Sequence, residues 1–135
     1  MIVLDCCAAI EIVKRSEWGL AMQDVLLGNE QVVSVDLLSA EVASVVRKHV
    51  LRGEIPAEAA TAYLREATGL VDKFYPMCDL QTEVLTESLR LGHSAYDMFY
   101  FVLARRLGAT LYTTDKKLSD LCLAHGVNAI AEVPF

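Results

Sequence analysis

The chain has 135 residues, of which 54% are hydrophobic and 22% charged, and its formal net charge is −6. This length fits one domain spanning residues 1–135, and the apolar content excludes a disordered chain. The sequence lacks a basic leader and an apolar run of roughly 18 residues, so we expect a cytoplasmic protein with no membrane span, and its negative charge argues against simple electrostatic capture of nucleic acid.

The first half of the chain is predicted to alternate strands with helices. Residues 1–5 form a β-prone apolar run that ends at Asp5, as expected of a strand buried on both faces. Glycine, asparagine and proline mark the helix boundaries further on. The predicted elements are a strand over 1–5, helices over 6–15 and 17–27 (closed by Gly28 and Asn29), a strand over 31–35, a helix over 37–52 ended by Gly53, and a helix from Pro56 to about Phe74.

The second half continues the alternation. Residues 75–80 are ambiguous, with a short strand interrupted by Pro76 as one interpretation. The remaining predicted elements are helices over 82–91 and 94–107, a strand over 109–113, a helix over 116–125 and a strand over 127–130, with glycines as helix stops. Strands that alternate with helices pair in parallel through right-handed crossovers, so we predict a three-layer α/β/α sandwich with a mainly parallel central sheet.

Four acidic residues stand in apolar or strand-end positions, and each has a purely structural interpretation. Asp5 and Asp115 each follow a strand and could only cap the next helix. Glu41 borders the apolar stripe of its helix, near the first turn. Asp97 is the sole acid in a strongly apolar helical run and could complete a capping box begun by Ser94.

Taken together, the four acids indicate a metal site. Asp5 and Asp115 fall at the carboxyl ends of predicted parallel strands, where open α/β sheets place their ligand crevice. Glu41 lies just past a third strand, and Asp97 reaches the same edge if its helix begins there. Carboxylates that converge without cations resist ionisation, and divalent ions remove that conflict. Oxygen ligands without His or Cys favour Mg²⁺ or Mn²⁺ over zinc, and such ions support phosphodiester cleavage.

Four segments of this sequence resemble, in chain order, the acidic motifs of PIN-domain nucleases. They are Ile2-Val3-Leu4-Asp5, Ser39-Ala40-Glu41-Val42, Ser94-Ala95-Tyr96-Asp97 and Leu111-Tyr112-Thr113-Thr114-Asp115. The stretch from Tyr96 through Leu107-Gly108-Ala109 to Leu118 looks especially like the VapC toxins of VapBC toxin–antitoxin pairs. The likeness spans essentially the whole chain, and its last portion is the most specific.

This resemblance implies a PIN-like fold and a Mg²⁺- or Mn²⁺-dependent endoribonuclease. Asp5, Glu41, Asp97 and Asp115 match the family's metal-binding acids, and Thr113 matches a position where the family often carries a supporting hydroxyl. The resemblance also implies an RNA substrate, a VapB-like antitoxin and a homodimer, with which the apolar excess is compatible. One departure is Cys6, a weaker hydrogen-bonding group where relatives usually carry Thr or Ser, which could alter metal affinity.

Several basic residues are candidate RNA contacts. Without the four candidate ligands, fourteen acids face twelve bases, so most of the negative charge belongs to the predicted site itself. Lys116 and Lys117 lie closest in sequence to a ligand and are the preferred RNA contacts. Paired bases are usually solvated helix faces, so the signal is weak. The other candidates are Lys14-Arg15, Arg47-Lys48, Arg52 and Arg105-Arg106.

Several other residues receive structural interpretations. Asp36 is expected to cap a helix, Asp120 to lie on a solvated helix face, and His93 to be a loop or cap residue. His49 and His125 occupy helix-end patterns with no partner indicated. Trp18 could line a groove for an antitoxin segment, although core packing is the preferred interpretation. The cysteines at 6, 7, 78 and 122 lack Cys-x-x-Cys spacing, and Cys6 and Cys7 are interpreted as small core residues.

Two other functions remain open. A phosphatase or phosphotransferase could use Asp5 as its nucleophile, although that chemistry would prefer a second acid in the first loop, where this chain has Cys6-Cys7-Ala8-Ala9. A nuclease-like module could bind RNA or protein without cutting. Glycine-rich nucleotide-binding loops are absent from the sequence.

Overall fold

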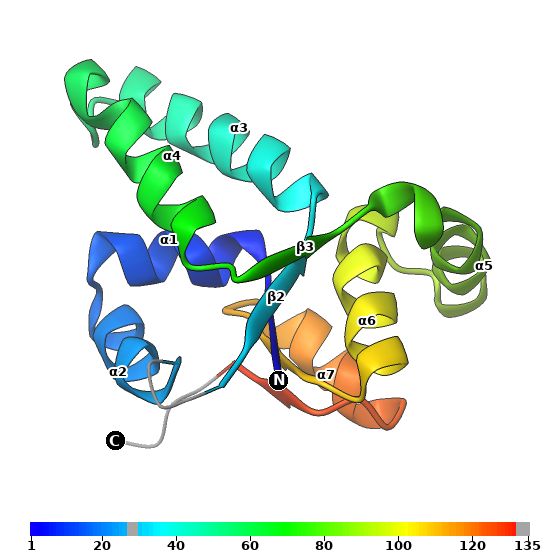
Figure 1. The fold of residues 1–135 in the computed structure, drawn as a ribbon. Helices are drawn as coiled ribbons and strands as arrows, with labels where there is room; N and C mark the ends of the chain where they lie inside the picture. The colour runs from blue at the N-terminus through cyan, green and yellow to red at the C-terminus, as the bar shows by residue number, and fades with distance from the viewer. Residues whose placement is uncertain (27–29, 132–135) are drawn as a thin grey trace.

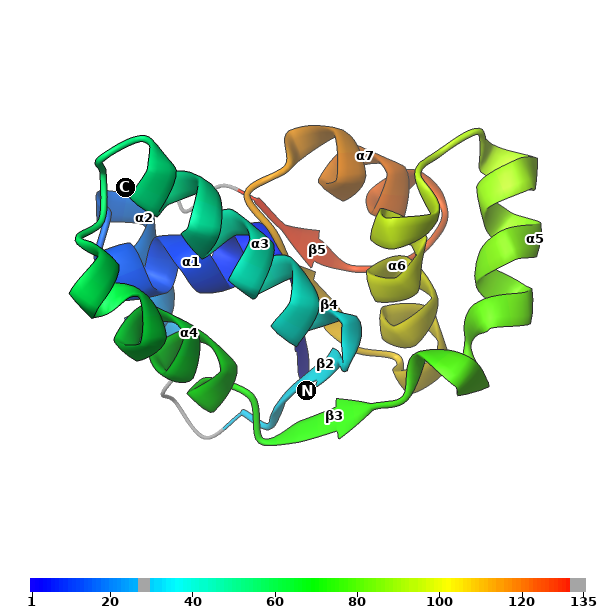
Figure 2. The same ribbon diagram turned by 90° about the horizontal axis from the view of Figure 1, so that it is seen from above.

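A parallel sheet forms the middle layer of the molecule (Figures 1 and 2). The computed structural model describes residues 1–26 and 30–131, and in these the strands are ordered β3-β2-β1-β4-β5. Every neighbouring pair in this sheet is parallel, as predicted. The strands are β1 (Ile2–Leu4), β2 (Val32–Val35), β3 (Lys73–Tyr75), β4 (Thr110–Tyr112) and β5 (Ala129–Ile130).

Helices cover both faces of the sheet. The helices are α1 (Cys6–Lys14), α2 (Glu17–Leu26), α3 (Leu37–Leu51), α4 (Ala60–Gly69), α5 (Gln81–Leu91), α6 (Ala95–Leu107) and α7 (Lys116–Ala124), with short 3₁₀ turns η1 (Ala57–Ala59) and η2 (Met77–Asp79). Figure 2 shows α1 to α4 on one side of the sheet and α5 to α7 on the other. The predicted three-layer sandwich is therefore confirmed.

Alternation along the strands builds two cores. Ile2 and Leu4 pack with α1, α3 and α4, whereas Val3, between them, packs with α6 and α7 on the opposite face. Successive side chains of a strand point to opposite faces, and both faces of β1 are buried. This is why β1 is apolar throughout and Asp5, directly after it, stands out.

The order of the strands places a crevice at β1 and β4. The chain steps outward from β1 to β2 and β3, and then returns to lay β4 on the other side of β1. In open α/β sheets the carboxyl ends of the strands at such a reversal form the ligand crevice. The ladder continues one residue past β1, where the Asp5 N–H donates to the Tyr112 carbonyl at 3.2 Å.

One predicted helix was too long. The helix expected from Pro56 to about Phe74 is divided into η1 and α4, and α4 ends at Gly69. Residues 73–75 instead form β3, which pairs with β2 at the sheet's edge. Lys73 and Phe74 are exposed, so this edge strand lacks the alternation of buried residues by which strands are recognised. The ambiguous segment 75–80 therefore contains the last residue of β3, which ends directly before Pro76, and the 3₁₀ turn η2.

The remaining elements follow the prediction with ends shifted by one or two residues. Gly53, Gly92, Gly108 and Gly126 all adopt positive φ after their helices, as helix-stopping glycines do. Leu27, Gly28 and Asn29, the predicted end of the second helix, lie outside the described residues. Among the described helices, none has the length and apolarity needed to cross a bilayer.

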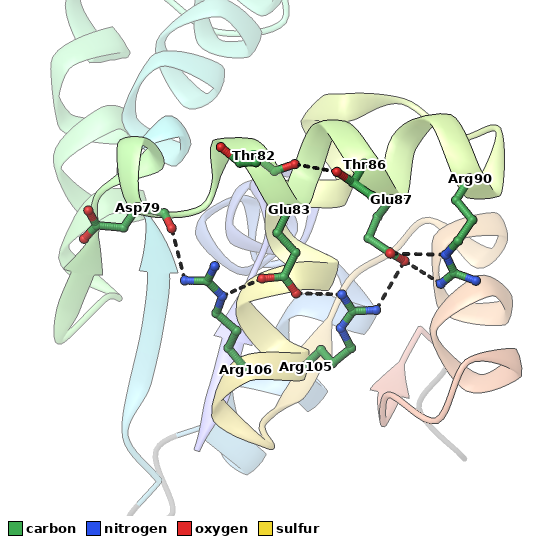
Figure 3. Close-up of polar contacts among 8 residues, drawn as sticks. All are labelled: Asp79, Thr82, Glu83, Thr86, Glu87, Arg90, Arg105 and Arg106. Atoms are coloured by element: carbon green, nitrogen blue, oxygen red, sulfur yellow. Dashed lines mark hydrogen bonds and ion pairs between the residues drawn. The ribbon is translucent and has the colours of Figure 1, made fainter.

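An ion-pair network fastens α5 to the C-terminal half of α6 (Figure 3). Glu83 accepts from Arg105 at 2.6 Å and from Arg106 at 2.7 Å, and Glu87 accepts from Arg90 at 2.5 Å and from Arg105 at 3.2 Å. Arg105 and Arg106, two of the candidate phosphate contacts, thus have carboxylate partners. They lie roughly 12 Å along α6 from Asp97, given the helical rise per residue.

Candidate active site

The predicted acids meet at one cavity. A hollow of about 430 Å³ is lined by Asp5, Glu41, Asp97 and Asp115 together with residues of α1, α3 and α6. Asp5 and Asp115 follow β1 and β4, the strands that flank the reversal in the sheet. Asp97 reaches the cavity because α6 begins at Ala95, close to this edge. Acids from four separate segments therefore share one edge of the sheet.

Asp5 is the most buried of the four acids, at 4% exposure. Its Oδ1 accepts from the Ala8 N–H at 2.9 Å, which confirms the helix cap, and from the Cys7 thiol at 3.1 Å. Burial raises the pKa of Asp5 to about 6, although the Thr113 hydroxyl and the Ala8 N–H work in the opposite direction. The buried carboxylate thus carries its charge at a free-energy cost.

Glu41 lies in the second turn of α3 and is held from across the cavity. The buried Tyr100 hydroxyl of α6 donates a 2.5 Å hydrogen bond to Glu41 Oε1. Burial raises the pKa of Glu41, this hydrogen bond lowers it, and the charge of Asp97 raises it further. The pKa of Tyr100 is raised, first by burial and then by Glu41, so the phenol stays protonated as a donor. Sequence reasoning missed Tyr100, because its position indicates only a buried aromatic residue.

Asp97 is paired with a histidine. His93 Nε2 lies 3.0 Å from Asp97 Oδ2, and the His93 side chain is only 7% exposed. Ser94 occupies the N-cap position of α6 but makes no side-chain capping bond, so the capping box proposed for Ser94 and Asp97 is wrong. His93 does lie in the loop before α6, as expected, but it also contacts a candidate ligand. The spacing of four residues between His93 and Asp97 is the sequence signal that could have revealed this contact.

Asp115 and Thr113 organise the turn after β4. Asp115 Oδ1 accepts from the N–H groups of Lys117 at 2.9 Å and Leu118 at 3.2 Å, which confirms it as the cap of α7. The buried Thr113 hydroxyl accepts from the Asp115 N–H at 3.0 Å. Thr113 therefore links Asp115 to Asp5, whose pKa its hydroxyl lowers.

The two adjacent cysteines both line the cavity. Cys6 is buried, as expected of a core residue, but Cys7 is only half-buried and contacts polar groups. Its sulfur lies 3.1 Å from Asp5 Oδ1 and 3.5 Å from Thr113 Oγ1, and accepts from the Thr114 N–H at 3.4 Å. Burial raises the pKa of both thiols to about 12, so they are neutral near pH 7. Cys7 is thus a site residue that the core interpretation missed.

The donor set matches a hard divalent cation. The four acids offer carboxylate oxygens, which Mg²⁺ and Mn²⁺ prefer, and their charges crowd one partly buried cavity. Within residues 1–26 and 30–131, however, no three His, Cys, Asp or Glu side chains are grouped closely enough to hold one ion. Asp5 and Asp115 are engaged as caps, Glu41 with Tyr100 and Asp97 with His93.

Most of the other candidate residues lie outside the lining of the cavity. Asp36 occupies the N-cap position of α3, but its side chain accepts from the Met77 N–H at 2.9 Å instead of capping the helix, so the cap prediction was wrong. Asp120 is exposed, as predicted. Lys116 and Lys117 are exposed on α7 and are not among the residues that line the cavity, whereas Lys14 of α1 is.

Trp18 has a structural role. Its indole N–H donates to the Ala131 carbonyl at 2.8 Å, and the ring packs against the core on the α1 face. This confirms the core interpretation that was preferred for this residue.

Comparison with known proteins identifies the family. No family model matches the chain. Ribonuclease VapC12 of Mycobacterium tuberculosis is 30% identical over 133 residues, which cover 98% of each chain. This chain belongs to the VapC family. Ribonuclease VapC1 of Mycobacterium tuberculosis is 39% identical over 83 residues, 62% of each chain, and ribonuclease VapC3 of Pyrobaculum aerophilum is 24% identical over 121 residues, 88% of this chain and 92% of that one.

Solved structures share the fold of this VapC-family chain. PAE2754 from Pyrobaculum aerophilum aligns with a TM-score of 0.72 at 20% identity, covering 88% of this chain and 84% of that one. VapBC2 from Rickettsia felis, bound to a DNA fragment from their promoter, aligns with a TM-score of 0.70 at 17% identity, covering 96% and 98%. The predicted PIN-like fold is confirmed.

Proposed function

We propose that this VapC-family chain is a Mg²⁺- or Mn²⁺-dependent endoribonuclease and the toxin of a toxin–antitoxin pair. The observation that carries the proposal is that Asp5, Glu41, Asp97 and Asp115, from four segments of the chain, line one cavity at the carboxyl edge of the sheet. The relatives VapC12, VapC1 and VapC3 are named ribonucleases, which supports RNA as the substrate.

The four acids would hold the cation. A bound divalent ion would supply an activated hydroxide, orient the phosphate and neutralise charge on the leaving oxygen. The chain's own residues keep the carboxylates in place: Tyr100 holds Glu41, and Cys7 and the Ala8 N–H hold Asp5. The raised pKa of Asp5 indicates that this cavity disfavours uncompensated negative charge, which a cation would relieve.

The proposed partners are a VapB-like antitoxin and a second copy of the chain. The VapBC2 neighbour supports an antitoxin. Large apolar side chains are also exposed, among them Leu51, Leu85 and Leu89 at 68%, 59% and 77%. Such side chains are compatible with protein–protein contacts. We propose that the protein acts in the cytoplasm, where RNA is its substrate.

The test combines metal, chelator and substitution. Purified protein is incubated with single-stranded and structured RNA in Mg²⁺, Mn²⁺ or EDTA, beside Asp5→Asn and Asp97→Asn. Asp120→Asn, which replaces an exposed acid of α7, is the matched control. We expect cleavage by the wild type and the control that needs metal, and none by the two site variants. Cleavage that persists in EDTA or in both site variants would reject this mechanism.

A non-cleaving binding module is the second candidate. It is favoured by the pairing of Asp97 with His93 and by the lack, among the described residues, of three ligands grouped around one point. RNA binding without turnover in any metal would establish it. The Asp5-nucleophile phosphatase is less suited to this geometry, because Asp5 is buried and its Oδ1 already accepts two hydrogen bonds.

A further inference from the structure

The cavity extends well beyond the four acids. Its walls include Ile10 and Lys14 of α1 and Val45 and His49 of α3. Glu41, Val45 and His49 are spaced by four residues and so lie along one face of α3. Given the helical rise, His49 is roughly 12 Å from Glu41 along the axis. Figures 1 and 2 show α1 and α3 both leading away from the sheet. The cavity lined by residues of both helices is a groove with an acidic end, at Asp5 and Glu41, and a distal end, at Lys14 and His49.

The distal end differs chemically from the acidic end. Lys14 is exposed in the last turn of α1, and one acid, Glu11, lies beside it in the lining. His49 Nδ1 is buried with no hydrogen-bond partner among the described residues. The other ring nitrogen lies 3.8 Å from Glu54 Oε2, so the ring is held only loosely. A buried polar atom without a partner costs free energy, which a hydrogen bond from a ligand would recover once the ring turns.

Apolar side chains connect the two ends. Ile10 is buried and Val45 half-buried, and both line the cavity. Ile10 lies between Asp5 and Lys14 in the sequence, and Val45 lies between Glu41 and His49 on α3. Aliphatic side chains of this kind can pack against the faces of nucleobases, while Lys14 suits a phosphate. The distance from Glu41 to His49 corresponds to on the order of three stacked nucleotides, at about 3.4 Å each.

We propose that Ile10, Lys14, Val45 and His49 form a distal subsite for the single-stranded RNA segment that flanks the cleaved phosphodiester. Lys14 contacts a backbone phosphate, and His49 forms a hydrogen bond with a ribose or base. The subsite rests on the ribonuclease function proposed above, since it places the strand across the acids. An RNA strand suits this lining, because Lys14 offers a cation to a backbone phosphate while Ile10 and Val45 offer apolar surface to a base.

The test measures RNA binding by Lys14→Gln and His49→Phe in an Asp97→Asn background, which prevents cleavage. Fluorescence anisotropy with a labelled single-stranded RNA is recorded across a range of salt concentrations. Arg65→Gln, which removes one positive charge from the exposed face of α4, is the control. We expect Lys14→Gln to raise Kd several-fold and to reduce the slope of log K against log salt by about 0.7, the contribution of one phosphate contact in a single strand.

His49→Phe supplies a second, independent readout. It removes the unpartnered nitrogen while keeping a ring, so the thermal midpoint should stay level or rise while Kd increases roughly tenfold. The slope against salt should not change, because no phosphate contact is lost. A residue with a merely structural role would lower the midpoint and leave Kd unchanged. Since Lys14 is exposed, its variant tests the subsite even if His49→Phe folds poorly.

Failure of the distal subsite can be distinguished from failure of the ribonuclease proposal. If both variants bind RNA as Arg65→Gln does while the wild type cleaves RNA with metal, the distal subsite is overturned and the ribonuclease proposal stands. If the wild type never cleaves but its RNA affinity depends on Lys14 and His49, the groove is an RNA site and the ribonuclease proposal fails. If the variants keep RNA affinity and lose only affinity for the antitoxin, the groove binds protein and the RNA subsite is overturned.

Discussion

The Tyr100 hydroxyl donates a 2.5 Å hydrogen bond to Glu41 Oε1 and so joins α6 to α3 across the acidic cavity. The two residues are 59 positions apart in the chain, and Tyr100 is buried. A buried aromatic ring has few alternative rotamers, so the phenol holds the carboxylate in one place. This bond sets where Glu41 would offer an oxygen to the proposed cation.

Replacing Tyr100 with Phe should therefore impair the site more than the fold. The ring and its packing remain, but Glu41 loses its donor, and a hydrogen bond to a charged group contributes roughly 1.5–3 kcal/mol. We expect kcat to fall by about tenfold or more and the metal concentration for half-maximal activity to rise. RNA cleavage titrated with Mg²⁺ and Mn²⁺ measures both quantities.

Tyr96→Phe provides the control, because Tyr96 is in the same helix but is 62% exposed. It should retain wild-type activity and metal dependence. A Tyr100→Phe enzyme with an unchanged metal titration would show that Glu41 needs no positioning by the phenol.

The stability of the protein should depend on pH through Asp5. Its pKa in the folded protein is about 6, above the ordinary value of 3.8, so between these values the folded state binds the proton more tightly than the unfolded state. Stability therefore falls as pH rises from about 4 to about 6. Asp5→Asn cannot ionise and still can cap α1, so in EDTA above pH 7 it should be more stable than the wild type, by up to about 3 kcal/mol.

Urea unfolding of both proteins from pH 4 to pH 8 tests this expectation. The difference in the free energy of unfolding should shrink towards pH 4, where the wild-type carboxyl is protonated in the folded state and partly protonated in the unfolded state. Saturating Mg²⁺ should narrow the difference at high pH if the cation binds this carboxylate. An Asp5→Asn protein that is less stable than the wild type at every pH would mean that hydrogen bonding to the carboxylate outweighs its burial.

Asp115 has a capping role that can be separated from its proposed metal role. Asp115→Asn keeps a side-chain oxygen for the N–H groups of Lys117 and Leu118, whereas Asp115→Ala removes it. We expect Ala to cost about 1 kcal/mol of stability and Asn much less. Both should lose RNA cleavage if the charge is needed for metal binding. Full activity in a well-folded Asn variant would reduce Asp115 to a helix cap.

Gly19 should be irreplaceable where α2 meets α1. A Cβ at this position would lie 2.0 Å from the Glu11 carbonyl oxygen, a backbone atom that cannot move aside cheaply. Gly19→Ala should destabilise the protein by about 1–3 kcal/mol or more, measured by urea unfolding. Gly69→Ala is the matched control, because a Cβ added there, at the end of α4, would have nothing within 4 Å, and it should be neutral or stabilising. Equal behaviour of the two variants would contradict the close α1–α2 contact.

Much of the architecture followed from local sequence patterns. Apolar runs such as Ile2–Leu4 and the glycines that end helices are short-range signals, and they predicted the parallel α/β sandwich. The edge strand β3 was missed because Lys73 and Phe74 are exposed, so its identity depends on pairing with β2 and not on its own residues. The role of Asp36 was also missed, because its side chain accepts a hydrogen bond from the Met77 N–H of a distant segment.

Some features of the candidate site also follow from the sequence, and others depend on the tertiary structure. Sequence alone determined that Asp5, Glu41, Asp97 and Asp115 are acids in strand-end or apolar surroundings, because the cost of placing charge there is a property of each residue and its neighbours. Only the tertiary structure decided which groups hold them: Tyr100 for Glu41, His93 for Asp97, and Cys7 with Thr113 for Asp5. Hydrogen bonds act over about 3 Å, and separations this small between remote segments exist only once the helices have packed on the sheet.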